Sequence, residues 1–261
     1  MNKKVLSATL LCFSLTLLFL PTASASSSDR VRGCEIWDSI CPTTRSALSP
    51  EELLAFPGYV MVREESIPRD GEVKVTQTSA PVDTMIIVDD DAKSYMEAFF
   101  HTPIPWSAVY DWAYNLLEGG DDPFNDWFSI DFVASQYRSW NSPSGSLTQL
   151  LQWGQQAFPK PVGIDVTFIL TGQNTLPEGG RSEVLGDAFI MSAWAGYYGN
   201  PLVNVWQHEA SHLYHAPDHS DWWSAITTVC IMSYFWCPYT RNWCGGCSSE
   251  ITSHKYRFGS V

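Results

Sequence analysis

A mixed α/β domain is predicted for the chain from about residue 81 to its end, on three observations. Short apolar runs bounded by turn-forming residues recur along this region, each with the length of a strand. Between them, apolar residues return every three or four positions, as they do on one face of a helix. No internal repeat and no low-complexity tract interrupts the pattern. The 261-residue chain therefore has room for one main domain and a smaller N-terminal segment.

The first expected elements are a strand and a helix. Thr84 to Val88 is a short apolar run that ends at Asp89-Asp90-Asp91, which predicts a strand. Helical periodicity follows from Trp106 to Leu117. Gly119-Gly120 predict the end of that helix, because glycine is the preferred residue just after a helix.

The next elements continue the alternation. Trp127 to Tyr137 alternates between apolar and polar residues and is expected to form a strand. Ser146 to Ala157 has the apolar spacing of a helix. Val166 to Leu170 and Leu185 to Met191 are the last two expected strands.

A helix is then expected to begin at Asn200-Pro201, with asparagine as its cap and proline at its first helical position. Its apolar stripe would pack on the sheet and consists of Leu202, Val203, Trp206, Ala210 and Leu213. His208 and His212 lie to one side of the stripe, which lets them face a cleft. Pro217 marks the latest end of the helix.

The N-terminus has the pattern of a secretory signal over residues 1–25. Lys3 and Lys4 precede an apolar stretch from Val5 to Leu20, and Ala23-Ser24-Ala25 is a small-residue cleavage site. The alternative is an uncleaved membrane anchor, but polar residues interrupt the apolar stretch. We expect a secreted, extracellular product without stable membrane association after cleavage. Residues 26–80 are expected to form an N-terminal extension or pro-segment.

Charge and cysteine content narrow the class of protein. There are 28 acidic against 15 basic side chains, a formal net charge of −13, which argues against nucleic acid or anionic membranes as partners. Six cysteines follow the signal segment, an even number that suits disulfides in an oxidising compartment. Cys34 and Cys41 are expected to pair with each other, and the alternative for Cys34 is to cap a catalytic metal from the pro-segment.

The most specific motif is His208-Glu209-Ala210-Ser211-His212. Two histidines four residues apart on a helix share one face and can bind one metal ion. Glu209 is rotated from them by about a quarter-turn, where a general base for a metal-activated water is needed. Four of the six histidines fall between positions 208 and 219, which favours a metal site over isolated packing roles. A catalytic zinc takes three protein ligands, so the third must come after the helix.

Here the sequence resembles the metzincin metallopeptidases, whose signature is His-Glu-x-x-His-x-x-Gly-x-x-His/Asp followed by a methionine-containing turn. Asp218 stands at the third-ligand position, and its Pro-Asp-His context is similar to that of snapalysins. His219 is the alternative third ligand. His215 occupies the usual glycine position and is a further candidate. The resemblance implies a zincin-like domain with a mixed, mostly parallel sheet, an active-site helix and a C-terminal subdomain with the methionine turn.

Cys230-Ile231-Met232-Ser233-Tyr234 is similar to the methionine turn of serralysins. The resemblance implies that Met232 forms an apolar floor beneath the zinc without binding it. It also implies that Tyr234 reaches the metal site and stabilises a developing oxyanion. The alternative for Tyr234 is an ordinary packed aromatic.

The C-terminal cysteines and the acidic segments leave two further predictions open. Two disulfides are expected among Cys230, Cys237, Cys244 and Cys247. The alternative is that these four cysteines bind a second, structural zinc, as the resemblance to archaemetzincins implies. Asp89 to Asp91 and Asp121 to Asp126 could hold Ca²⁺, but solvated ends of helices and strands explain them better.

The predicted function is that of a secreted zinc-dependent endopeptidase acting on protein or peptide substrates. Zn²⁺ held by His208, His212 and Asp218 would activate a water molecule, with Glu209 as the general base. The strand Leu185 to Met191 would bind extended substrate at its edge. The alternative function is a non-catalytic secreted metal-binding protein, for which Glu209 would not be needed.

Overall fold

The computed structural model describes residues 80–258 except 176, 198 and 199. The predictions for the signal segment, the N-terminal extension, and Cys34 with Cys41 lie outside the described residues. Within them, no helix is both long enough and apolar enough to cross a membrane.

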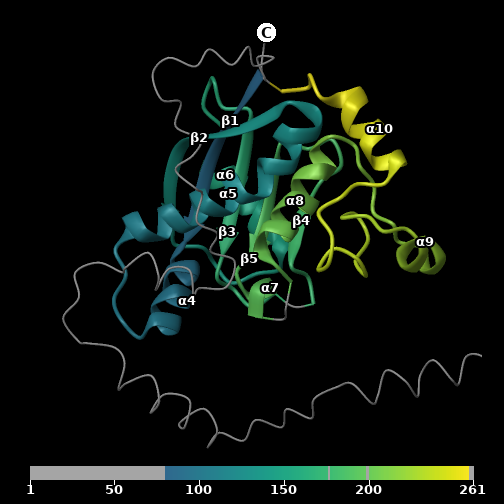
Figure 1. Cartoon of the computed structure of the whole chain (residues 1–261). Coiled ribbons are helices and arrows are strands. Elements are labelled where there is room, and N and C mark those ends of the chain that lie inside the picture. Colours follow the sequence, from purple (N-terminus) through teal and green to yellow (C-terminus); the bar gives the residue numbers. More distant parts are fainter. Residues whose placement is uncertain (1–79, 176, 198–199, 259–261) are drawn as a thin grey trace, which may run out of the picture. The chain divides into compact units, whose positions relative to one another are not determined.

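The core of the fold is a five-stranded, mostly parallel sheet (Figure 1). Its strands in spatial order are β2 (Ile130–Trp140), β1 (Ala80–Asp89), β3 (Val166–Thr171), β5 (Ala188–Ser192) and β4 (Gly180–Ser182). The first four strands run parallel, and β4 pairs antiparallel with β5 at the edge. The predicted mixed α/β class and the mostly parallel sheet are confirmed.

Helices cover both faces of this sheet. They are α4 (Asp90–Phe100), α5 (Trp106–Phe128), α6 (Leu147–Ala157), α7 (Trp194–Tyr197), α8 (Leu202–Leu213), α9 (Trp222–Thr227) and α10 (Gly245–His254). Alternate residues of β1 pack into different cores, with Ile86 toward α5 and α8 and Ile87 toward α6. This alternation follows from the two-residue period of a strand. The helix predicted from Ser146 to Ala157 is present as α6, and Ser146 caps it in a capping box with Gln149.

Helix α5 does not end at Gly119-Gly120 as predicted but continues to Phe128. A Cβ atom on Gly120 would lie 2.3 Å from the indole of Trp206 in α8. The glycine is therefore needed for the close approach of two helices and not for a helix end. A sequence pattern cannot separate these two uses, because the partner helix lies far along the chain.

Two other predicted boundaries are also corrected. The strand predicted at Leu185 to Met191 begins only at Ala188, and β5 has neighbours on both sides, β3 and β4. The strand at this edge of the described sheet is β4, which is too short to give a sequence signal. Helix α8 begins at Leu202 with Pro201 as its cap residue and no capping side chain, so Asn200 lies one position too early to cap it.

The described residues give no support for a calcium site in the acidic segments. Asp89 caps α4, accepting from Ala92 N, and also accepts from Gly172 N. Burial raises the pKa of Asp121 to about 9, and its carboxylate accepts a hydrogen bond from Phe132 N. A carboxyl group with so high a pKa stays protonated at pH 7, and a protonated carboxyl is a poor ligand for Ca²⁺, which favours ionised oxygen ligands. Neither segment belongs to a metal-capable group among the described residues.

Candidate metal centre

Helix α8 is fixed by Trp206, whose ring is fully buried and meets Phe132 and Phe189 edge-on. One residue advances the helix by about 100°. His208 and His212 therefore lie on a side of α8 that is turned away from Trp206. The apolar stripe read from the sequence thus sets the direction in which the two imidazoles point.

Three predicted ligands converge beside α8. His208 Nε2 lies 3.1 Å and His212 Nε2 lies 3.4 Å from Asp218 Oδ1. One ligand atom from each residue lies within 4.8 Å of the others, close enough to surround a single ion. Both histidines are buried, with 4% and 6% of their surfaces exposed, and Asp218 is half-buried.

The other ring nitrogen of each histidine is held by the backbone. His208 Nδ1 lies 2.9 Å from the Ile231 carbonyl oxygen, and His212 Nδ1 lies 2.8 Å from that of Ala216. A carbonyl oxygen only accepts, so each Nδ1 bears a hydrogen and Nε2 is the nitrogen that faces Asp218, as a ligand to a metal ion requires. Asp218 Oδ1 is itself buried without a hydrogen-bond donor. Three lone-pair atoms facing one another in this way fit a bound cation, and the backbone contacts are those that orient histidine ligands.

The charges of the group also favour a cation. Burial lowers the pKa of His208, but Asp218, Cys237 and the Glu209 carboxylate raise it to a value well above its usual range. Burial tends to raise the pKa of Asp218, yet its contacts with His208 and His212 hold it well below its usual range. A positive charge between these side chains is therefore stabilised, whether a proton or a metal ion supplies it.

A sharp turn separates α8 from Asp218. His215, which stands where the resemblance expects glycine, has a φ of 69°. Histidine adopts this left-handed conformation more readily than most residues. The turn brings Asp218 back toward α8, whereas the side chains of His215 and His219 belong to other groups. Among the three candidates for the third ligand, only Asp218 lies with His208 and His212.

Glu209 is buried between α8 and the edge strand β4. Ser182 Oγ donates to the Glu209 carbonyl oxygen at 3.0 Å, and a Cβ atom on Gly180 would lie 2.5 Å from Glu209 Oε1. The glycine thus leaves the space that the carboxylate occupies. Burial raises the pKa of Glu209, with His208 and His212 opposing the change. A carboxyl whose pKa is raised by burial is suited to accept and release a proton.

The segment from Cys230 to Tyr234 lies across the site. Ile231 supplies the carbonyl that holds His208, and the fully buried Met232 accepts from His219 N at 2.9 Å. Tyr234 is 67% exposed, and its hydroxyl donates to Asp218 Oδ2 at 2.9 Å. Burial of the hydroxyl and the nearby Asp218 raise the pKa of Tyr234, so it stays a hydrogen-bond donor at neutral pH.

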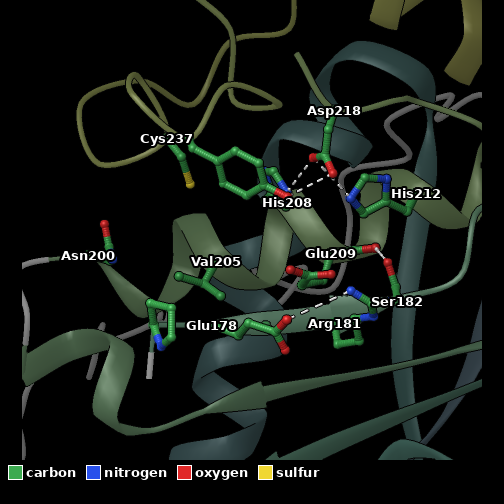
Figure 2. Close-up of a pocket in the computed structure, with 14 residues that line it drawn as sticks. Glu178, Arg181, Ser182, Asn200, Val205, His208, Glu209, His212, Asp218 and Cys237 are labelled. Carbon is green, nitrogen blue, oxygen red and sulfur yellow. Dashed lines mark hydrogen bonds and ion pairs between the residues drawn. The ribbon is translucent and has the colours of Figure 1, made fainter. Parts of the chain in front are cut away.

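These side chains line a cavity of about 260 Å³ (Figure 2). In Figure 2, Asp218 stands over His208 and His212, while Arg181 and Ser182 lie across from α8 beside Glu209. The further lining residues are Pro177, Glu178, Gly179, Gly180, Asn200, Val205, Tyr234 and Cys237. Gly180 and Ser182 are not predicted from the sequence, because a glycine next to a short polar run is too common a pattern to identify a site.

The four described C-terminal cysteines are all free thiols, so the expected disulfides are not present among them. Three of them meet His219: its Nε2 lies 3.4 Å from Cys244 Sγ and 3.6 Å from Cys247 Sγ. Cys230 completes this group, in which ligand atoms lie within 4.8 Å of one another. Cys237 lies apart from it, against His208 and the α8 backbone. The predicted set of four cysteines is therefore corrected to three cysteines and His219.

Comparisons with known proteins find likeness in solved structures only. No family model and no curated protein matches the chain. A chain from a chaperone–substrate complex is 10% identical with a TM-score of 0.50, over 69% of this chain and 34% of that one, so this chain spans about a third of its length. Archaemetzincin from Archaeoglobus fulgidus is 14% identical (TM-score 0.39, 65% of this chain and 99% of that one). Metalloproteinase-II from Bacteroides fragilis is 13% identical (TM-score 0.43, 68% and 53%). At such low identity a likeness concerns the fold alone and assigns no activity to this chain.

Proposed function

We propose that the protein is a zinc-dependent endopeptidase of metzincin type. The observation that supports this most strongly is the convergence of His208 Nε2, His212 Nε2 and Asp218 Oδ1 at one wall of a cavity. Two imidazoles and one carboxylate form a ligand set that suits zinc and leaves a coordination position for a reactant. The general base expected of such an enzyme, Glu209, lines the same cavity.

His208, His212 and Asp218 would hold the zinc ion, which would supply polarisation of the scissile carbonyl and a more acidic water. Glu209 takes the proton of the attacking water and delivers it to the leaving amine nitrogen. Its burial keeps the carboxylate poorly solvated and raises its pKa, which favours both transfers. The absence of a side chain at Gly180 leaves room for the carboxylate, because a Cβ atom there would lie 2.5 Å from Glu209 Oε1.

Substrate is proposed to lie along β4 and not along the strand Leu185 to Met191. In the described sheet β4 is the last strand, and Gly179, Gly180 and Arg181 border the cavity beside Glu209. An extended peptide adds to such an edge through main-chain hydrogen bonds. This mode of binding requires no chain terminus, which supports cleavage within a polypeptide.

Tyr234 is proposed to assist the reaction as a hydrogen-bond donor. Its hydroxyl contacts Asp218 Oδ2 and borders the cavity, next to the atoms where charge would develop. Release from Asp218 would let the hydroxyl donate to a developing oxyanion. Until then the hydrogen bond orients the Asp218 carboxylate.

The second group, His219 with Cys230, Cys244 and Cys247, is proposed to hold a structural zinc ion. One imidazole and three thiols are a common ligand set for such zinc. Cys247 donates a hydrogen bond that lowers the pKa of Cys230 below its usual range, as befits a thiolate ligand. None of the four residues lines the cavity.

Export is also proposed, and it is supported only by the signal pattern of residues 1–25. N-terminal sequencing of protein recovered from the medium of producing cells tests it. The expected product begins at Ser26. An intact N-terminus on cell-associated protein would contradict export.

The decisive test of the enzymatic proposal replaces Glu209 with glutamine. Purified wild type should carry zinc and degrade an unfolded protein, and a chelator should stop the degradation. Glu209→Gln should keep its zinc and lose activity by at least roughly 10²-fold, because general base catalysis contributes about 10²–10⁴. Glu178→Gln is the matched control, since Glu178 is an exposed carboxylate on the wall of the same cavity. Full activity in Glu209→Gln would refute the role of Glu209 as general base. A zinc-loaded wild type that degrades nothing would refute the enzymatic proposal and leave the non-catalytic metal-binding alternative.

A further inference from the structure

A third group of metal-ligating side chains lies outside the two groups described above. His215 follows α8, while Glu250 and His254 belong to α10. One ligand atom from each of the three lies within 4.8 Å of the other two. Neither the catalytic proposal nor the cysteine group uses any of them.

The geometry of this group is that of a partly open site. His215 Nδ1 lies 2.8 Å and His254 Nδ1 lies 3.9 Å from Glu250 Oε2. Glu250 and His254 are four residues apart on α10 and so share one face of the helix. The rings of His215 and His254 are 5.0 Å apart between centroids. The side chains are 44%, 42% and 33% exposed for His215, Glu250 and His254. His254 Nδ1 also lies 2.9 Å from the Glu250 carbonyl oxygen, so its ring must rotate to share an ion with the other two.

The backbone at His215 is in the left-handed region, with a φ of 69°. Histidine adopts this conformation more readily than most residues, so the turn is compatible with an imidazole at this position. The contact between His215 Nδ1 and Glu250 Oε2 holds the ring beside α10.

The chemistry of the group selects the kind of ion. Two imidazoles and one carboxylate favour zinc, copper or nickel, whereas calcium and magnesium favour oxygen ligands alone. The Glu250 carboxylate supplies a negative charge that a bound cation would neutralise. Three ligands on an exposed surface hold an ion less tightly than a buried four-ligand group does.

We propose that His215, Glu250 and His254 form a separate, exchangeable site for a divalent transition-metal ion, with zinc as the ion to test. An ion bound there joins the turn after α8 to helix α10. The same turn leads to Asp218, and Arg257, just after α10, already donates to the Leu213 carbonyl at the end of α8 (2.7 Å). Occupancy of the site therefore restrains the segment that positions Asp218. The site does not depend on peptidase activity.

The test compares zinc stoichiometry in the full-length protein by equilibrium dialysis against rising concentrations of free zinc. Wild type should bind one exchangeable equivalent beyond those retained after extensive dialysis. His254→Gln and His215→Gly should each lose that equivalent, and His215→Gly also removes the strain at this position. His101→Asn is the matched control, because His101 is another exposed histidine with positive φ and belongs to none of the metal-capable groups.

A second measurement follows backbone hydrogen exchange of residues 214–219 with and without the exchangeable zinc. Exchange should slow in wild type and in His101→Asn, and should not change in His254→Gln. Repeating the titration in His212→Ala separates this site from the catalytic one, because the exchangeable equivalent should persist there. Identical stoichiometry and exchange in wild type and both site variants would overturn the proposal, whatever the enzymatic tests show.

Discussion

Asp218 and His219 are consecutive residues of one loop, yet they belong to two metal-capable groups that differ in ligand chemistry, ligand number and access to the cavity. Asp218 joins two histidines at the wall of a cavity, and the next residue, His219, joins three cysteines away from it. The first, which we call the open group, offers three nitrogen and oxygen ligands from His208, His212 and Asp218. The second, the closed group, offers four ligands, three of them sulfur, from His219, Cys230, Cys244 and Cys247. Three ligands leave a position for a reactant, whereas four close the coordination shell. Ligand number and access to the cavity, more than metal affinity, therefore distinguish a reactive site from a structural one.

The largest expected effect comes from removing a ligand of the open group. His212→Ala should lose one zinc equivalent and all measurable peptidase activity, because two ligands hold the ion too weakly. The fold should survive, since the cysteine group is untouched. Elemental analysis, an activity assay and circular dichroism together check this. Stoichiometric zinc at the open group in this variant would contradict the ligand assignment.

Removing a ligand of the closed group should act on stability first. Cys247→Ser should lower the free energy of unfolding by on the order of 5 kcal/mol or more, since structural zinc contributes apparent binding free energies of roughly 10–16 kcal/mol in small domains. Thermal unfolding and zinc content measure the effect. Cys237→Ser is the matched control, because Cys237 is a buried free thiol outside the closed group. Equal destabilisation in both variants would argue against a second zinc.

The neighbouring pair Asp218 and His219 gives the sharpest comparison. Asp218→Ala should lower activity strongly and stability little, because its side chain belongs to the open group alone. His219→Ala should lower the unfolding temperature and lose the other zinc equivalent. Activity and thermal unfolding of the two variants measured at equal zinc concentration decide the matter. The reverse pattern would assign His219 as the catalytic ligand.

The sequence predicted the open group better than the closed one, and the reason is the range of the contacts. His208, Glu209 and His212 sit within one helical turn, so helix geometry alone places them together. His219 reaches Cys230, Cys244 and Cys247 across loops of irregular conformation, and no periodicity specifies such a path. Cysteine count and spacing therefore suggested disulfides, and Cys237 was grouped with the others in place of His219.

The fold shows the same dependence on range. Strands β1 and β3 and helix α6 carry strong local patterns, and their predicted positions are confirmed within a few residues. The predicted end of α5 at Gly119-Gly120 is too early because Gly120 makes room for the ring of Trp206, which lies 86 positions later in the chain. Strand β4 has three residues and gains its order from pairing with β5, which local sequence does not encode.

A smaller effect is expected at Tyr234, whose hydroxyl touches only the open group. Tyr234→Phe should lower kcat and kcat/KM by on the order of 10²-fold, as loss of one oxyanion donor does. Zinc affinity should change little, because Tyr234 binds Asp218 Oδ2, whereas Oδ1 is the oxygen that faces the two histidines. Steady-state kinetics and a zinc-binding titration separate the two effects. A fall in zinc affinity with unchanged kcat at saturating zinc would make Tyr234 a positioning residue for Asp218.

The smallest effect on activity is expected at Gly180 in β4, the glycine that lies against Glu209. Gly180→Ala places a methyl group 2.5 Å from Glu209 Oε1 and Cγ, so the carboxylate must shift. Activity should fall by roughly tenfold, a fraction of what complete loss of a general base costs. Zinc content should be unchanged because no ligand contacts Gly180. Gly245→Ala is the control, since a methyl group there would meet no atom within 4 Å. Full activity in Gly180→Ala would show that the space beside β4 does not set the position of Glu209, and this part of the proposed mechanism would be wrong.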